Sequence, residues 1–154
     1  MLVSVFADAS YHHESGAGGW AGWAKSDRGS HYEGGPIRTS LTSSNDAEFL
    51  AAVNAVHMAL ARGIALNGDN ILLQSDCQAV GHILARLGDY PTEIIKKARA
   101  HLMGLKFAHK LHITYRHVKS HSYRDEPRYA VNRLCDGLAG RGMVAARTAM
   151  GWRS

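Results

Sequence analysis

Two short apolar runs in this chain each lead to an aspartate, and together they constrain the fold more than any other feature. Residues 2–7 are mostly apolar and end at Asp8, and the run 71–73 leads through a short polar pair to Asp76. Such runs are typical of strands that are buried on both faces of a sheet. The carboxyl ends of neighbouring parallel strands meet at one sheet edge, where open α/β sheets bind their ligands. We therefore expect Asp8 and Asp76 to lie close together at such an edge.

The remaining segments predict a three-layer α/β domain with a mixed sheet. Two further strands are expected over residues 20–24 and 30–34, and residues 111–116 alternate as a half-exposed strand does. Apolar spacing with capping and stop signals predicts four helices: from within 42–46 to Arg62-Gly63, over 78–87, from 91–93 to about 105, and from Pro127 through Leu138. This order of three strands, a helix, a strand, two helices, a strand and a helix predicts a single domain over residues 1–154.

Composition narrows the classes of protein to which the chain can belong. A formal net charge of +5 over 154 residues favours a polyanionic partner such as nucleic acid without requiring one. Cys77 and Cys135 are too few for a disulfide framework and form no CxxC pair, so we expect them to pack rather than to bind zinc. No leader-like segment and no apolar run of transmembrane length is present, which predicts a cytoplasmic protein without membrane contact.

Four acidic residues form the candidate site. Asp8 and Asp76 follow apolar runs, Glu48 falls in the first turn of a predicted helix, and Asp136 lies on the last helix, one turn after Asn132. Taken singly, each acid is more simply a cap or a surface charge. If they converge, they offer a set of hard oxygen ligands that suits Mg²⁺ or Mn²⁺. In a basic protein, such a site predicts metal-assisted attack on a phosphodiester.

Four ordered blocks of sequence resemble type 1 ribonuclease H, within the wider ribonuclease H-like superfamily. The blocks are Asp8-Ala9-Ser10 followed by residues 16–20, then residues 44–52, residues 75–80, and residues 118–122 leading to 131–139. They occur in the family's order and span the chain from residue 2 to about residue 142. The resemblance implies a five-stranded mixed sheet of order 3-2-1-4-5 with strand 2 antiparallel, in agreement with the element order read from the residues.

The resemblance also implies an activity and a set of roles. The expected reaction is hydrolysis of the RNA strand of RNA/DNA hybrids by a two-metal-ion mechanism that leaves 5′-phosphate and 3′-hydroxyl ends. Two Mg²⁺ ions, with Mn²⁺ as a substitute, would be held by four carboxylates: Asp8, Glu48, Asp76 and Asp136. His121 corresponds to a loop histidine that assists proton transfer or product release. An alternative pair of metal ligands, His12 and His13, lies on a Gly-rich loop where adjacent histidines are more often solvated.

Substrate contacts are also implied by the resemblance, with several departures. Ser10, Ser44, Asn45 and Gln78 occupy positions that face the substrate in relatives, where ribose 2′-hydroxyls distinguish RNA from DNA. Asn45 has an alternative role as a helix cap. Glu14 replaces a frequent asparagine, Ser44 replaces an amide, and the basic, Trp-rich protrusion of some bacterial relatives is absent. A set of basic residues either substitutes for this protrusion or forms only a solvated helix face: Lys96, Lys97, Arg99, Lys106 and Lys110.

Two rival functions remain open at this stage. The first is a DNA-directed nuclease of the same superfamily, such as a junction resolvase or a transposase-like enzyme, which keeps the fold and the metals. The second is a catalytically silent nucleic-acid-binding module, which predicts that an acid is lost, whereas all four are present. The interpretation that we favour is a monomeric ribonuclease H.

Overall fold

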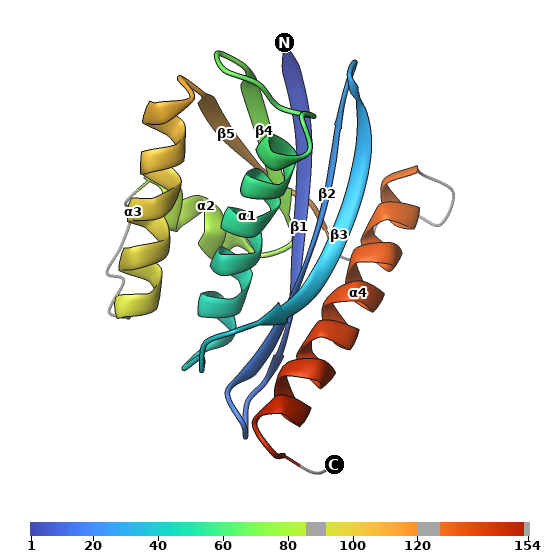
Figure 1. The fold of residues 1–154 in the computed structure, drawn as a ribbon, viewed down its shortest axis with the longest axis vertical. Coiled ribbons are helices and arrows are strands. Elements are labelled where there is room, and N and C mark those ends of the chain that lie inside the picture. The colour runs from blue at the N-terminus through green and yellow to red at the C-terminus, as the bar shows by residue number, and fades with distance from the viewer. Residues whose placement is uncertain (86–91, 120–126, 153–154) are drawn as a thin grey trace.

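The computed structural model describes residues 1–85, 92–119 and 127–152 and contains nine helices and strands within them (Figure 1). The strands are β1 (Leu2–His12), β2 (Ala17–Ser26), β3 (Gly29–Ile37), β4 (Asn70–Ser75) and β5 (His112–His117). The helices are α1 (Ser44–Ala61), α2 (Gln78–Ala85), α3 (Glu93–Ala108) and α4 (Pro127–Ala149). The predicted order of strands and helices is confirmed.

The five strands form one mixed sheet in the order β3-β2-β1-β4-β5, as the resemblance implied. Strands β1, β4 and β5 are parallel to one another, and β2 is antiparallel to both β1 and β3. The prediction that β1 stops at Asp8 is wrong, because its pairing with β4 ends at Phe6 while its pairing with β2 continues to His12. Asp8 therefore lies inside β1, at a point where this strand still pairs with β2 but no longer pairs with β4.

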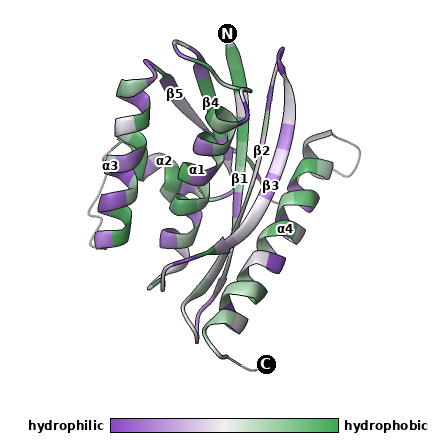
Figure 2. Ribbon diagram, viewed as in Figure 1, coloured by the Kyte–Doolittle hydropathy of each residue, from purple (hydrophilic) through white to green (hydrophobic). Residues whose placement is uncertain are grey.

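Helices cover both faces of the sheet and form the expected three layers (Figure 1). Helix α1 packs on β1 and β2 from one side, with α2 and α3 beside it, and α4 packs on β1, β2 and β3 from the other side. Most of the core lies on the α1 side, around Phe49, Ile71 and Leu73, which are at most 1% exposed. Figure 2 shows α3 and α4 striped with hydrophobic and hydrophilic residues, as amphipathic surface helices are.

Glycines let both helical layers approach the sheet closely. A Cβ on Gly22 of β2 would lie 2.8 Å from Cβ of Ala55, so α1 rests directly on that strand. On the opposite face, a Cβ on Gly19 or Gly142 would overlap backbone atoms of the facing element. At these glycines the backbone of α4 therefore lies directly against β2 and β3.

The helix ends follow the predicted capping signals. Ser43 is the N-cap of α1, and its side chain accepts a hydrogen bond from the Asp46 backbone N–H. Asn45 is therefore inside the helix, and its alternative role as the cap is excluded. Gly63, with φ of 71°, follows the C-cap Arg62, and Thr92 caps α3. The predicted end of α2 at residue 87 lies outside the described residues. Among the helices of the described ranges, none has the length and apolarity needed to span a membrane.

Candidate active site

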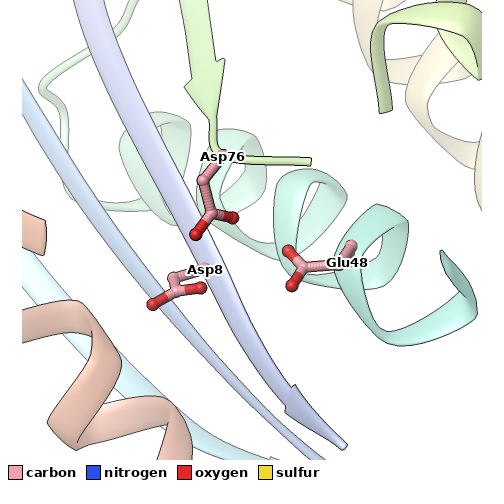
Figure 3. Close-up of side chains that lie close together, drawn as sticks. All are labelled: Asp8, Glu48 and Asp76. Atoms are coloured by element: carbon pink, nitrogen blue, oxygen red, sulfur yellow. The ribbon is translucent and has the colours of Figure 1, made fainter. Parts of the chain in front are cut away.

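Three of the predicted acids meet at the edge of the sheet. Asp8 on β1, Glu48 on α1 and Asp76 just after β4 each offer a carboxylate oxygen, and these oxygens all lie within 4.8 Å of one another (Figure 3). The register explains the meeting of the aspartates, because Phe6 pairs with Gln74 and two further residues along each chain lead to Asp8 and Asp76. The predicted convergence of these three carboxylates is confirmed.

Burial and mutual repulsion make it costly for these carboxylates to be ionised. Burial, followed by the charge of Asp76, raises the pKa of Asp8 from 3.8 to about 7, against a hydrogen bond that its Oδ1 accepts from the Ala9 N–H. Burial, followed by the charges of Asp8 and Asp76, raises the pKa of Glu48 from 4.5 to about 9. A cation bound beside Asp8 and Glu48 would stabilise their ionised forms.

The ligand chemistry of the cluster fits a divalent metal. Glu48 Oε2 is buried and has no hydrogen-bond partner among the described residues. A buried carboxylate oxygen without a partner is expensive, and binding a cation would remove that cost. Carboxylate oxygens are the ligands that Mg²⁺ and Mn²⁺ prefer. The three acids therefore fit the metal that the sequence predicted.

Asp136 stands apart from this group. It lies on α4 as an exposed residue, and its charge contributes to the raised pKa of Asp8, so it faces the cluster across a longer gap. One turn earlier on the helix, Asn132 is 8% exposed, and neither of its side-chain amide atoms has a partner in the part of the chain that the structure describes. The fourth acid is thus near the site but is not one of the acids within 4.8 Å of one another.

None of the three histidines considered from the sequence is placed at the acidic cluster by the described residues. His121 lies outside the described residues, so its role stays a prediction. His12 Nδ1 lies 2.6 Å from the Ser15 hydroxyl, and its ring packs edge-on against Trp152. Neither His12 nor His13 belongs to a metal-ligand group of three within the described ranges, where the acidic cluster is the group found.

The predicted substrate-contact residues lie around this cluster. Ser10 lies on β1 opposite Gly19 of β2, two residues beyond Asp8. Ser44 and Asn45 are exposed in the first turn of α1, and Gln78 is the exposed first residue of α2. The two helix starts are adjacent, because Cys77 Sγ lies 3.8 Å from Asn45 Oδ1. Each of these four polar residues therefore lies within four positions of an acid of the cluster.

The contacts that hold the turn at Asp76 are not predicted by the sequence. The Tyr115 hydroxyl and the His117 ring, both on β5, contact residues 75–77 across about forty positions of chain. The alternating pattern of residues 111–116 predicted a strand there, but it carries no signal for such a long-range contact. Only the register of β4 with β5 reveals it.

The fold and the carboxylate cluster define a three-layer α/β domain with an acidic site at the carboxyl edge of its parallel strands. The chain belongs to the RNase H family, whose model matches residues 2–144. No curated protein sequence matches the chain.

Solved structures share the fold at low sequence identity. RNase H1 from the halophilic archaeon Halobacterium salinarum NRC-1 matches with a TM-score of 0.71 and 21% identity, covering 95% of this chain and all of the other. The N-terminal RNase H domain of a Mycobacterium tuberculosis protein gives 0.71 and 17%, covering 96% and 97%. LC11-RNase H1 in complex with an RNA/DNA hybrid gives 0.73 and 14%, covering 94% and 98%. The LC11 enzyme was isolated from compost by a metagenomic approach.

Proposed function

We propose that this protein is a metal-dependent endonuclease that hydrolyses the RNA strand of RNA/DNA hybrids and leaves 5′-phosphate and 3′-hydroxyl ends. The observation that carries the proposal is the meeting of Asp8, Glu48 and Asp76 within 4.8 Å on the RNase H fold. Burial and neighbouring carboxylates raise the pKa values of Asp8 and Glu48, so their ionised forms cost stability unless a cation is bound. The structure of LC11-RNase H1 with a hybrid supports the choice of substrate.

The acids would hold two Mg²⁺ ions, and Mn²⁺ would substitute for them. When bound, these ions would lower the pKa of the attacking water and stabilise the leaving 3′ oxygen. Asp8, Glu48 and Asp76 would be the inner ligands, and Asp136 would complete the set from α4. In this proposal His121 assists proton transfer or product release from its loop.

The surface around the acids would position the hybrid. Ser10, Ser44, Asn45 and Gln78 offer neutral hydroxyl and amide groups rather than charges. Such groups suit ribose 2′-hydroxyls, which both donate and accept hydrogen bonds. Selection of RNA would therefore come from the starts of α1 and α2, and the net charge of +5 would favour the polyanion as a whole. We expect the chain to act as a monomer in the cytoplasm.

The test is cleavage of matched, end-labelled substrates: an RNA/DNA hybrid, RNA/RNA, DNA/DNA and a four-way DNA junction, each with Mg²⁺ and with chelator. The proposal predicts metal-dependent cutting of the RNA strand of the hybrid alone. Asp8→Asn is the inactive control, since it keeps the shape of the side chain and removes a metal-ligand charge. Cutting of the DNA duplex or junction would assign a DNA-directed nuclease of the same superfamily. Binding without any cutting would assign a silent nucleic-acid-binding module.

A further inference from the structure

The turn that carries Asp76 is held along its whole length by the end of β5. Three successive backbone carbonyls of the turn lie within hydrogen-bond distance of two side chains of this strand. Tyr115 Oη lies 3.3 Å from Ser75 O and 2.8 Å from Cys77 O, and His117 Nε2 lies 3.1 Å from Asp76 O. In addition, the Val118 N–H donates to Ser75 O at 2.8 Å. The end of β5 therefore contacts the backbone at Asp76 and at the residues immediately before and after it.

The Tyr115 hydroxyl completes a closed ring of hydrogen bonds around Asp76. The Cys77 N–H donates to Ser75 Oγ at 3.3 Å, and Ser75 Oγ lies 2.7 Å from Tyr115 Oη. A tyrosine hydroxyl has one hydrogen, and a carbonyl can only accept. Two arrangements of the protons close the ring. In one, Tyr115 donates to Cys77 O and accepts from the Ser75 hydroxyl; in the other, Tyr115 donates to Ser75 Oγ and the Ser75 hydroxyl donates to Cys77 O at 3.2 Å. Ser75 is fully buried, so water does not compete for these bonds.

The ring of Tyr115 is itself fixed by its packing. A Cβ on Gly81 of α2 would lie 2.5 Å from the tyrosine ring, so the glycine makes room for the aromatic face against the helix. The ring is half-buried and packs against the main core cluster. A side chain held on one face by α2 and bonded at its tip presents its hydroxyl at a fixed position. Such fixed outer groups are the ones that orient metal ligands.

We propose that Tyr115 is a positioning residue that sets the place of the Asp76 carboxylate through the Ser75–Cys77 turn, with His117 as a second support. This inference rests on the proposed function only in assuming that the acidic cluster binds a divalent metal. The same turn leads directly into Gln78 and touches Asn45 through Cys77. Tyr115 therefore links the metal-ligand geometry with the surface that we expect to contact the substrate.

Tyr115→Phe is the test, because it removes the hydroxyl and keeps the ring against Gly81. The probe is Mn²⁺ alone, followed through the electron paramagnetic resonance signal of the free ion without any nucleic acid. We expect the dissociation constant for Mn²⁺ to rise about tenfold, at the lower end of the effect of outer partners on metal affinity. We also expect added Mn²⁺ to restore the cleavage rate of this variant but not that of Asp8→Asn.

Ser26→Ala is the matched control. It also removes a hydroxyl that donates to a backbone carbonyl, Ile64 O at 2.7 Å, but it lies at the end of β2 far from the acids. Both variants should lose similar thermal stability, and only Tyr115→Phe should lose Mn²⁺ affinity. His117→Ala trims an exposed ring and is expected to raise the dissociation constant by a smaller factor, which keeps the inference testable if Tyr115→Phe folds poorly.

Equal Mn²⁺ dissociation constants for Tyr115→Phe, His117→Ala and Ser26→Ala would overturn the inference, whatever the cleavage assay shows. Conversely, weaker Mn²⁺ binding by Tyr115→Phe in a protein that does not cut hybrids would keep the inference and reject the proposed function. The two failures are therefore distinguishable.

Discussion

Two aspartates flank strand β4 in opposite electrostatic settings. At the start, Asp69 is 3% exposed and accepts hydrogen bonds from the Arg28 guanidinium at 2.6 Å and from the Leu66 N–H at 2.8 Å. At the other end, Asp76 faces the carboxylates of Asp8 and Glu48. The Arg28 hydrogen bond holds the pKa of Asp69 at about 2, whereas burial and repulsion raise the pKa of Asp8 to about 7.

This difference separates a group that stabilises the fold from a group that prepares a site. The start of β4 supplies its own cations, Arg28 and the N-terminal amine, so Asp69 is satisfied without a ligand. At the other end, burial and the charge of Asp76 raise the pKa values of Asp8 and Glu48, so a bound cation would stabilise their ionised forms. Like charges held close together are costly, and a cation bound among Asp8, Glu48 and Asp76 would offset that cost.

The largest expected effect is loss of cleavage when an acid of the cluster is neutralised. Asp8→Asn or Asp76→Asn should slow hybrid cleavage by about a thousandfold, because a metal ligand supplies several kcal/mol of transition-state stabilisation. The free energy of unfolding should not fall, since a repelling charge is removed. Steady-state cleavage rates and urea unfolding of the same preparations measure both. Retained activity in either variant would remove the metal-ligand assignment.

At the opposite end of β4 the expectation is reversed. Asp69→Asn should lower the free energy of unfolding by about 2 kcal/mol, because it weakens a buried, charge-assisted set of hydrogen bonds. Its cleavage rate, measured below the melting temperature, should match that of the unmodified protein. Asp27→Asn, an exposed acid of the neighbouring turn, is the control and should change stability by about 0.5 kcal/mol or less. A large loss of cleavage in folded Asp69→Asn would contradict the separation of the two ends.

Stability against pH should separate the two ends in the metal-free protein. Because folding raises the pKa of Asp8 to about 7 and that of Glu48 to about 9, the folded state binds more protons than the unfolded state above about pH 4. The free energy of unfolding in chelator should therefore fall by several kcal/mol between about pH 5 and about pH 8. Asp69 acts oppositely, since its stabilisation is lost only as pH falls from about 4 toward about 2.

Urea titrations at several pH values provide the measurement for this prediction. Added Mg²⁺ should recover stability at about pH 8, because a ligand that binds only the folded state stabilises it. The Asp8→Asn variant should show a flatter pH dependence and a smaller response to metal. A free energy of unfolding that rises between about pH 5 and about pH 8 in chelator would contradict the raised pKa values of Asp8 and Glu48.

The smallest expected effect concerns the fourth acid. Asp136→Asn should reduce the cleavage rate by about tenfold, less than Asp8→Asn, because the exposed Asp136 lies outside the group within 4.8 Å and an exposed charge acts through water. Matched rates at saturating and limiting Mg²⁺ measure whether it acts on metal binding. An effect as large as that of Asp8→Asn would show that Asp136 is as important for cleavage as the three clustered acids, and would contradict this prediction.

The sequence was sufficient for the elements and for the meeting of Asp8, Glu48 and Asp76. Apolar runs predict buried strands, parallel neighbours bring their ends together, and the capping segment places Glu48 one turn into α1. These inferences use local periodicity and one topological rule. The length of β1 was missed, because the residues after Asp8 carry no apolar pattern, and their strand conformation depends on pairing with β2.

Contacts between distant segments could not be predicted in the same way. Arg28 reaches Asp69 over 41 positions, and Tyr115 reaches Ser75 over 40. In the sequence, Asp69 follows Asn67-Gly68 and looks like an ordinary turn residue, and nothing marks it as buried. Such pairs depend on the register of strands and on rotamers, which periodicity does not encode. The contrast between the two ends of β4 therefore emerges only from the structure.

The most direct test of this contrast is a crystal of the protein soaked in Mn²⁺, with the anomalous signal of the metal measured at both ends of β4. We expect an anomalous peak among the carboxylates of Asp8, Glu48 and Asp76 and none at Asp69, which Arg28 and the N-terminal amine already neutralise. An empty cluster, or a peak at Asp69 instead, would contradict it.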